Sequence, residues 1–236
     1  MRSLVIAVSQ PRVVPLDIAT NATVHASAVR AAAARVVVFP ELSLTGYEPA
    51  APLLAIDDPR LAPLIAACAA TDTIALVGAP IDGPHIATLA IDGDGVRVAY
   101  RKMYPHSTDE ERFRPGPGPE VLEVDGWRLG LAICRDTGVA EHVAATAELG
   151  IDAYVAGIAD EPAADEVMAE RARRIGAEHG VWVAFSSFAG PTGGGFTETA
   201  GRSGIWTPDG MVAARAGRSV GEIARATMFA ADLARL

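Results

Sequence analysis

Residues 129–136 read Leu-Gly-Leu-Ala-Ile-Cys-Arg-Asp, an apolar run that stops abruptly at a cysteine followed by two charged residues. A short run of this kind is typical of a buried strand, and Cys134 would be its last side chain. Open α/β folds carry their chemistry at the carboxyl ends of such strands. The stretch therefore predicts an α/β fold with a thiol at the edge of a sheet.

Two other strand-like runs also end on polar side chains. Residues 36–39 are followed by Pro40 and Glu41, and the alternating residues 96–100 are followed by Arg101 and Lys102. Taken alone, the three groups have ordinary interpretations as a core cysteine, a loop carboxylate and a solvated lysine. Their common position at strand ends favours one shared site.

These three side chains suit nucleophilic attack on a carbonyl group. A thiol reacts as its thiolate and needs a nearby base or positive charge. Glu41 could take the proton of Cys134, and Lys102 could stabilise an anionic tetrahedral intermediate. The backbone N–H of Arg135 could be a second donor to that oxyanion.

Composition limits the class of protein. The chain has 236 residues, of which 50% are hydrophobic, and this fits a single α/β domain spanning residues 1–236. The formal net charge of -9 argues against a nucleic-acid-binding surface, which needs clustered Lys and Arg. With only Cys68 and Cys134 and no secretory signal pattern at residues 1–8, we expect free thiols, no membrane association and a cytoplasmic location.

The order of predicted elements indicates mixed sheets. Helices are expected at residues 18–34, 61–70, 139–149 and 163–179. Strands are expected at residues 4–9, 36–39, 74–77, 85–91, 96–100, 121–124, 127–134, 153–156, 181–186, 204–207 and 211–214, with a last apolar segment at 226–232. Crossover helices mixed with hairpins predict two mixed sheets with helices outside, a four-layer α-β-β-α sandwich.

Four motifs in chain order resemble those of the nitrilase superfamily, the carbon–nitrogen hydrolases. They are residues 39–47 (Phe-Pro-Glu-Leu-Ser-Leu-Thr-Gly-Tyr), 101–103 with 113–116 (Arg-Lys-Met and Phe-Arg-Pro-Gly), 130–136 (Gly-Leu-Ala-Ile-Cys-Arg-Asp) and 201–210 (Gly-Arg-Ser-Gly-Ile-Trp-Thr-Pro-Asp-Gly). The resemblance runs from about residue 4 to residue 233. It implies the same four-layer fold and the amidase-like branch, because true nitrilases usually carry Trp where this chain has Arg135.

The resemblance also implies how the site works. Glu41 would be general base and then general acid, Cys134 the nucleophile, and Lys102 the oxyanion donor. No metal and no organic cofactor is implied. The substrate would be a small amide, with no nucleic acid or membrane as partner, and protomers would pair into a homodimer or higher homo-oligomer through helices near the nucleophile.

Several positions depart from the family pattern. A supporting carboxylate usually lies four residues before the Phe of the second motif, and here the candidates are Asp109 and Glu110, with Glu111 next to them. The candidates for substrate contact are Tyr47, His106, Arg135, Gly157 and Ile158. Gly157 and Ile158 would form a small apolar wall or leave room for substrate. Arg135, together with Arg112, could attract a substrate carboxylate.

Three hypotheses for function remain open at this point. The first is a thiol amidase acting on a small linear carboxamide or carbamoyl compound. The second is a nitrilase, and the third is a catalytically silent relative used as a binding protein. A nucleotide-binding fold is disfavoured, because Gly193-Gly194-Gly195 lacks the spacing and the following Lys of a phosphate-binding loop.

Overall fold

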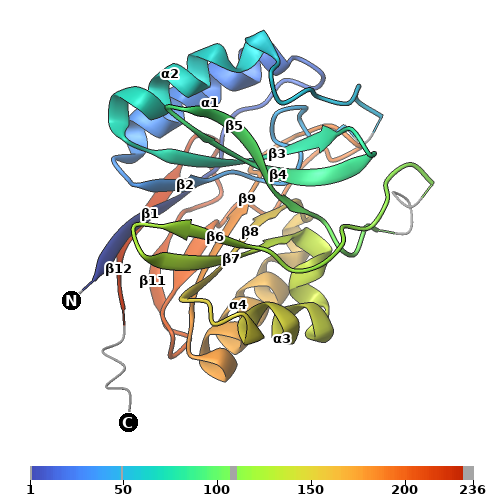
Figure 1. The fold of residues 1–236 in the computed structure, drawn as a ribbon. Coiled ribbons are helices and arrows are strands. Elements are labelled where there is room, and N and C mark those ends of the chain that lie inside the picture. The colour runs from blue at the N-terminus through green and yellow to red at the C-terminus, as the bar shows by residue number, and fades with distance from the viewer. Residues whose placement is uncertain (1, 49, 107–110, 231–236) are drawn as a thin grey trace.

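Two six-stranded sheets lie face to face between two pairs of helices in the computed structural model, which describes residues 2–48, 50–106 and 111–230. Figure 1 shows α1 (Ile18–Ala32) and α2 (Ala62–Thr71) above one sheet and α3 (Ala140–Glu148) and α4 (Asp165–His179) below the other. The predicted α-β-β-α sandwich of mixed sheets is therefore confirmed.

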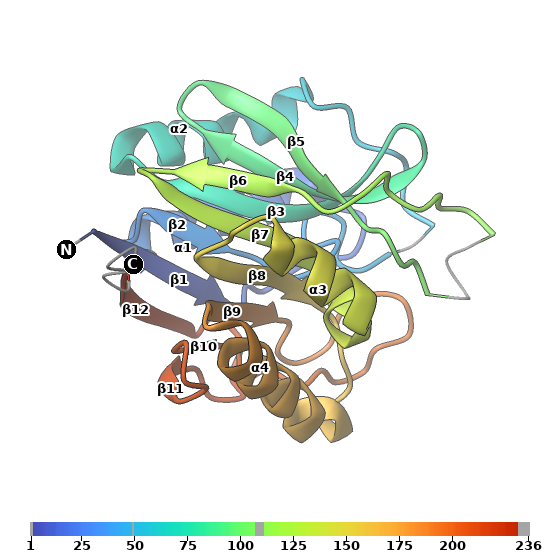
Figure 2. The ribbon, with the colours of Figure 1, turned by 60° about the horizontal axis from the view of Figure 1, so that its bottom comes forward.

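Each sheet has a parallel centre and antiparallel edges. The first sheet has the order β12 (Ile223–Phe229), β1 (Ser3–Ser9), β2 (Val36–Val38), β3 (Ile74–Ile81), β4 (His85–Asp92), β5 (Gly95–Arg101). The second has the order β11 (Val212–Arg215), β10 (Gly204–Trp206), β9 (Trp182–Ser187), β8 (Ala153–Ile158), β7 (Trp127–Ile133), β6 (Val121–Val124). Figure 2 shows the two sheets from a second side, with α3 and α4 across the face of the second.

Alternation along the strands divides the hydrophobic residues among three layers. Leu4, Ile6 and Val8 of β1 point into the core between the sheets, whereas Ala7 points toward α1 and α2. Residues on strand β7 divide in the same way between the central core and the layer against α3 and α4. This follows from the two-residue period of a strand, which sends successive side chains to opposite faces.

Strand ends converge because of the strand directions. Strand β3 is parallel to β2, β4 is antiparallel to β3, and β5 is antiparallel to β4. Strands β2 and β5 therefore run in the same direction and end at the same edge of the sheet. Strands β7 and β8 are parallel neighbours in the other sheet. The residues that follow these four strands therefore meet at one end of the sandwich.

Several boundaries differ from the sequence-based prediction, among them the end of β8, which lies at Ile158 instead of residue 156. Strand β3 continues through Gly78 and Pro80 to Ile81, instead of ending at residue 77. The carbonyl of Pro80 accepts a hydrogen bond from the N–H of Leu54 at 2.8 Å, on the side of the strand away from β4. An N–H at this position would point to that same side, so the pairing with β4 loses no hydrogen bond. Strand β7 ends at Ile133, one residue earlier than predicted, and the last apolar segment is a full edge strand, β12, beginning at Ile223.

No helix among the described residues is long and apolar enough to span a membrane. The start of α1 and the end of α4 follow ordinary capping chemistry. Asp17 accepts a hydrogen bond from the backbone N–H of Thr20 at 3.0 Å at the start of α1. Gly180 ends α4 in the left-handed conformation with φ of 66°, as predicted.

Candidate active site

Glu41 lies in a turn that follows β2 and passes between the two sheets. Two glycines leave the space that the backbone of this turn occupies. A Cβ on Gly78 of β3 would lie 2.2 Å from the backbone nitrogen of Leu42, and one on Gly157 of β8 would lie 2.6 Å from the carbonyl oxygen of Phe39. Backbone from both sheets therefore fixes the segment that carries Glu41.

Glu41 and Lys102 form a buried ion pair. The Nζ atom of Lys102 lies 2.5 Å from Oε1 of Glu41, and the side chains are 2% and 0% exposed. Burial alone would lower the pKa of Lys102, but the negative charges of Glu41 and of the Cys134 thiolate outweigh it and raise that pKa above the usual lysine value. Lys102 therefore stays an ammonium group.

Cys134 begins the short helical turn η2 (Cys134–Gly138) directly after β7. Its φ of 43° is unusual for a residue with a side chain and marks a sharp turn at the strand end. The thiol lies 3.6 Å from the carbonyl oxygen of Ala159. Burial, and then the charge of Glu41, raise its pKa well above the usual value, against the opposite effect of Lys102. The resting thiol is therefore protonated and needs a base.

Asp136 ties the cysteine turn to the strand that carries Lys102. Its carboxylate accepts hydrogen bonds from the N–H of Ile133 at 3.0 Å, the N–H of Tyr104 at 2.9 Å and the hydroxyl of Tyr100 at 2.7 Å. Burial raises the pKa of Asp136 in spite of these bonds. Because these partners lie on either side of Lys102 and just before the thiol, Asp136 sets the distance between the two groups.

The network behind Asp136 extends to His142. Since Tyr100 donates its proton to Asp136, its oxygen accepts from Nε2 of His142 at 2.9 Å. Nδ1 of His142 then accepts from the hydroxyl of Tyr154, also at 2.9 Å. Burial lowers the pKa of His142 to about 4, so the ring is neutral at ordinary pH. Among Asp136, Tyr100, His142 and Tyr154, only the carboxyl group of Asp136 can carry a full charge at ordinary pH.

A cleft of about 590 Å³ opens over these groups. It brings together most of the residues that the sequence pointed to as reactive or substrate-contacting, and it adds several more. Its lining comprises Tyr47, Lys102, His106, Cys134, Arg135, Ala159, Asp160, Glu161, Ala164, Gly194 and Phe196. Acyl transfer through a cysteine uses a thiol as nucleophile, a base and a donor for the oxyanion. The thiol and the carboxylate–ammonium pair can supply these roles, and the cleft can hold a small substrate.

Other expected contacts lie elsewhere. Gly157 and Ile158 are buried in β8 and do not line the cleft, because Gly157 packs against backbone rather than leaving room for a ligand. Arg112 also lies outside the lining, where it donates to the carbonyl of Ala51 and stacks over Phe113 at 4.9 Å. The predicted supporting carboxylates, Asp109 and Glu110, fall outside the described residues.

The sequence-based prediction missed Asp160, Glu161 and Phe196. The two acids follow the end of β8 after one residue, Ala159, so the rule that found the other strand-end groups would have found them had the strand been extended to Ile158. Phe196 reaches the cleft through a glycine-rich loop, whose Gly193 N–H donates to the carbonyl of Gly46 at 2.7 Å. No local pattern in the sequence signals that contact.

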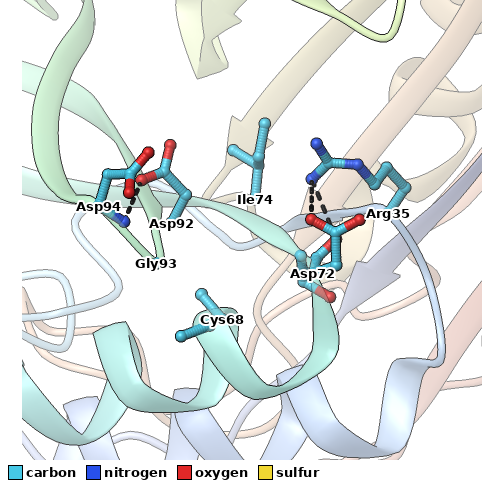
Figure 3. A pocket seen from close by; sticks show the side chains of 9 residues that line it. Arg35, Cys68, Asp72, Ile74, Asp92, Gly93 and Asp94 are labelled. Carbon is cyan, nitrogen blue, oxygen red and sulfur yellow. Dashed lines mark hydrogen bonds and ion pairs between the residues drawn. The ribbon is translucent and has the colours of Figure 1, made fainter.

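A second hollow, of about 380 Å³, lacks reactive groups. Figure 3 shows Arg35 and Asp72 on one side and Asp92 on the other. Asp72 lies 3.7 Å from Arg35, and Asp92 pairs with Arg97 at 2.5 Å. Burial raises the pKa of the Cys68 thiol to about 11, so it stays protonated. Cys68 and Cys134 are both free thiols, as predicted.

Within the described part of the chain, no group of three or more His, Cys, Asp or Glu side chains is arranged to hold a metal ion.

Comparison with known proteins identifies the family. The profile of the carbon-nitrogen hydrolase family matches residues 5–235. The chain belongs to the carbon–nitrogen hydrolases. A curated relative, "Hydrolase in pqqF 5'region" of Pseudomonas protegens, is 32% identical over 216 residues, covering 86% of this chain and 75% of that protein. The (R)-stereoselective amidase of a Pseudomonas species is 27% identical over 140 residues, covering 56% of this chain and 51% of that enzyme.

Solved structures of carbon–nitrogen hydrolases share the fold. A double mutant of the amidase from Nesterenkonia sp. AN1, in complex with acrylamide, superimposes with a TM-score of 0.86 at 23% identity, covering 97% of this chain and 92% of that one. The NitN amidase of the same organism has a TM-score of 0.84 at 24% identity, covering 94% and 91%. The protein is thus an enzyme of the carbon–nitrogen hydrolase type, similar in fold to nitrilase-superfamily amidases.

Proposed function

We propose that this protein is a thiol amidase that cleaves the C–N bond of small linear amides or carbamoyl compounds and releases ammonia. The observation that carries the proposal is the buried Glu41–Lys102 pair, whose lysine lines the same cleft as the Cys134 thiol. A buried ion pair is costly to form and is a weak source of stability, so its place next to a thiol points to chemistry.

The first step forms a thioester. Because the Cys134 thiol is protonated at rest, Glu41 takes its proton as sulfur bonds to the amide carbon. The ammonium of Lys102 and the N–H of Arg135, an early amide of a helical turn, stabilise the negative oxygen of the tetrahedral intermediate. Protonated Glu41 then gives its proton to the leaving nitrogen, and ammonia departs.

The second step regenerates the enzyme. Glu41 takes a proton from water, and the hydroxide adds to the thioester carbon. Collapse of this intermediate breaks the C–S bond, and the thiol regains its proton. The sum is amide plus water giving acid plus ammonia, with no oxidant, metal or organic cofactor consumed.

Relatives support a nucleophilic cysteine. One structure of the Nesterenkonia amidase is described as showing covalent addition of the acetamide moiety of fluoroacetamide at the active-site cysteine. We propose the same role for Cys134. The proposal also includes one catalytic domain, pairing of protomers into a homodimer, and a carboxylate from Asp109 or Glu110 supporting Lys102.

The test is ammonia release from a panel of small amides, carbamoyl amino acids and nitriles, measured for the wild type and Cys134→Ala. We expect release from amides or carbamoyl compounds by the wild type only. Lys102→Met should lose on the order of 3 kcal/mol of transition-state stabilisation, about a hundredfold or more in rate. Release from nitriles alone would assign a nitrilase. No release from any compound, with a thiol inert to iodoacetamide, would assign a binding protein.

A further inference from the structure

Asp160 stands in the wall of the cleft on a fixed backbone. It follows β8 after Ala159, whose carbonyl contacts the Cys134 thiol, and its own carbonyl accepts a hydrogen bond from Ala200 N–H at 2.9 Å. Its side chain is half-buried and lines the cleft. Within the described part of the chain, its carboxylate has no hydrogen bond or ion pair. A half-buried carboxylate without a partner is costly unless a ligand supplies one.

The positive charges near the acids of the cleft are few among the described residues, and Arg171, which lowers the pKa of Asp160, acts from outside the lining. Lys102 is neutralised by Glu41 at 2.5 Å. Arg135 is exposed and donates to the carbonyl of Pro105 at 2.9 Å. Asp160 and its neighbour Glu161 add two negative charges to the lining. An anionic substrate would place a like charge against them, whereas a cation would pair with them.

Aromatic rings complete the chemistry of a cation site. Tyr47 and Phe196 line the same cleft and meet edge to face, with ring centroids 5.2 Å apart. The negative face of an aromatic ring attracts ammonium groups, and the attraction grows when the group is partly shielded from water. A carboxylate and two aromatic rings in one small cleft therefore favour an ammonium group over a neutral or anionic one.

We propose that Asp160 selects substrates that carry an ammonium group at the end opposite the amide. This rests on the proposed amidase function and names the substrate class of that same site. The amide carbon lies at Cys134 and the ammonium group pairs with the Asp160 carboxylate, against Tyr47 and Phe196. Glu161, which is more exposed, adds attraction at the mouth of the cleft.

The ionisation of Asp160 gives the selection a pH dependence. Burial raises its pKa to about 6. The charges that act on it are Arg171 and Lys102, which lower the pKa, and Glu41 and Glu161, which raise it. The carboxylate is therefore charged above about pH 6, where it can hold an ammonium group, and becomes neutral below that pH.

The experiment compares kcat/KM for three amides of similar size: 5-aminopentanamide, hexanamide and glutaramate. We expect the wild type to prefer 5-aminopentanamide over hexanamide by roughly 10- to 100-fold, the range for hydrogen bonds between charged groups. Asp160→Asn should lose most of this preference, because kcat/KM for 5-aminopentanamide falls far more than kcat/KM for hexanamide. Asp160→Glu, which restores the charge, should keep part of it, and Asp82→Asn, an exposed acid outside the cleft, should change nothing.

Binding provides a readout that does not depend on turnover. Calorimetry with Cys134→Ala should show tighter binding of 5-aminopentanamide than of hexanamide, and the double variant with Asp160→Asn should bind both equally. Hexanamide turnover without any preference for the ammonium compound would overturn this inference and leave the amidase proposal standing. No turnover of any of the three compounds, with no difference in binding, would overturn both.

Discussion

The Glu41–Lys102 pair offers a sharp test in the free energy of unfolding. Both groups are removed from water and lie 2.5 Å apart, with side chains 0% and 2% exposed. Removing one partner leaves the other charge buried without compensation, which typically costs about 3–5 kcal/mol. Domains of this kind are stable by only about 5–15 kcal/mol, so either single substitution should remove a large part of the total.

The assay is urea denaturation at pH 7.5 of the wild type, Lys102→Met, Glu41→Gln and the double variant. We expect each single variant to lose about 3–5 kcal/mol and the double variant to recover most of that loss, because a pair replaced by neutral groups of similar volume is often tolerated. Single variants that lose less than about 1 kcal/mol, or losses that simply add in the double variant, would refute the buried, mutually dependent pair.

Four further predictions follow from the rest of the site. Asp136→Asn should weaken the three hydrogen bonds that fix the distance between the Cys134 thiol and Lys102. We expect kcat to fall about tenfold or more with KM little changed. Equal effects on kcat and KM would indicate a role in substrate binding instead. The preference for 5-aminopentanamide over hexanamide should fall as pH drops through about 6, where Asp160 becomes protonated, and a ratio that stays constant from pH 5 to pH 8 would contradict this. His142 has a pKa of about 4 in the folded protein against 6.5 in the unfolded chain, so the unfolded chain takes up a proton first as the pH falls. The stability that neutral His142 contributes is therefore complete above pH 6.5 and is lost toward pH 4, by up to about 3 kcal/mol. Urea titrations should give a flatter dependence of the unfolding free energy on pH for His142→Gln. Gly157→Ala should displace the backbone segment that carries Glu41, at a cost of about 1–3 kcal/mol in unfolding free energy and most of the activity. Gly118→Ala is the control and should have no effect, because a Cβ there meets nothing within 4 Å. Similar losses in both variants would contradict the close packing at Gly157.

Strand-end reasoning predicted that Glu41, Lys102 and Cys134 lie close together, and the structure pairs Lys102 with Glu41 and places Lys102 and Cys134 in the lining of one cleft. The runs before Glu41 and Cys134 are short and apolar, the run before Lys102 alternates, and each stops at a polar residue, so the pattern marked where the strands end. The sheet directions then bring these ends together, which is why Lys102 and Cys134 line one cleft while the buried Glu41 pairs with Lys102.

The same reasoning failed where a strand end was placed too early. With β8 ended at residue 156, Gly157 and Ile158 became candidates for substrate contact, but the strand runs to Ile158 and the acids after it line the cleft. Pro80 misled in a similar way, since a proline marks a strand end only when its N–H would be needed by a neighbouring strand. Such boundaries depend on partners that the sequence does not display.

Contacts made by loops were beyond prediction for a different reason. Phe196 and Gly194 line the cleft because their loop is held to the segment around Gly46 by hydrogen bonds from Gly193 and Thr192, residues far from Gly46 in the chain. The positive φ of Cys134 likewise arises from the turn after β7, and no residue near it announces the strain.

The most direct test of the central claim is the intact mass of the protein quenched with acid during turnover of hexanamide. We predict a fraction of the wild-type protein heavier by one hexanoyl group, with peptide mapping placing it on Cys134, and no adduct in Cys134→Ala. Ammonia release by the wild type without such an adduct, or release that persists in Cys134→Ala, would contradict catalysis through a thioester on this residue.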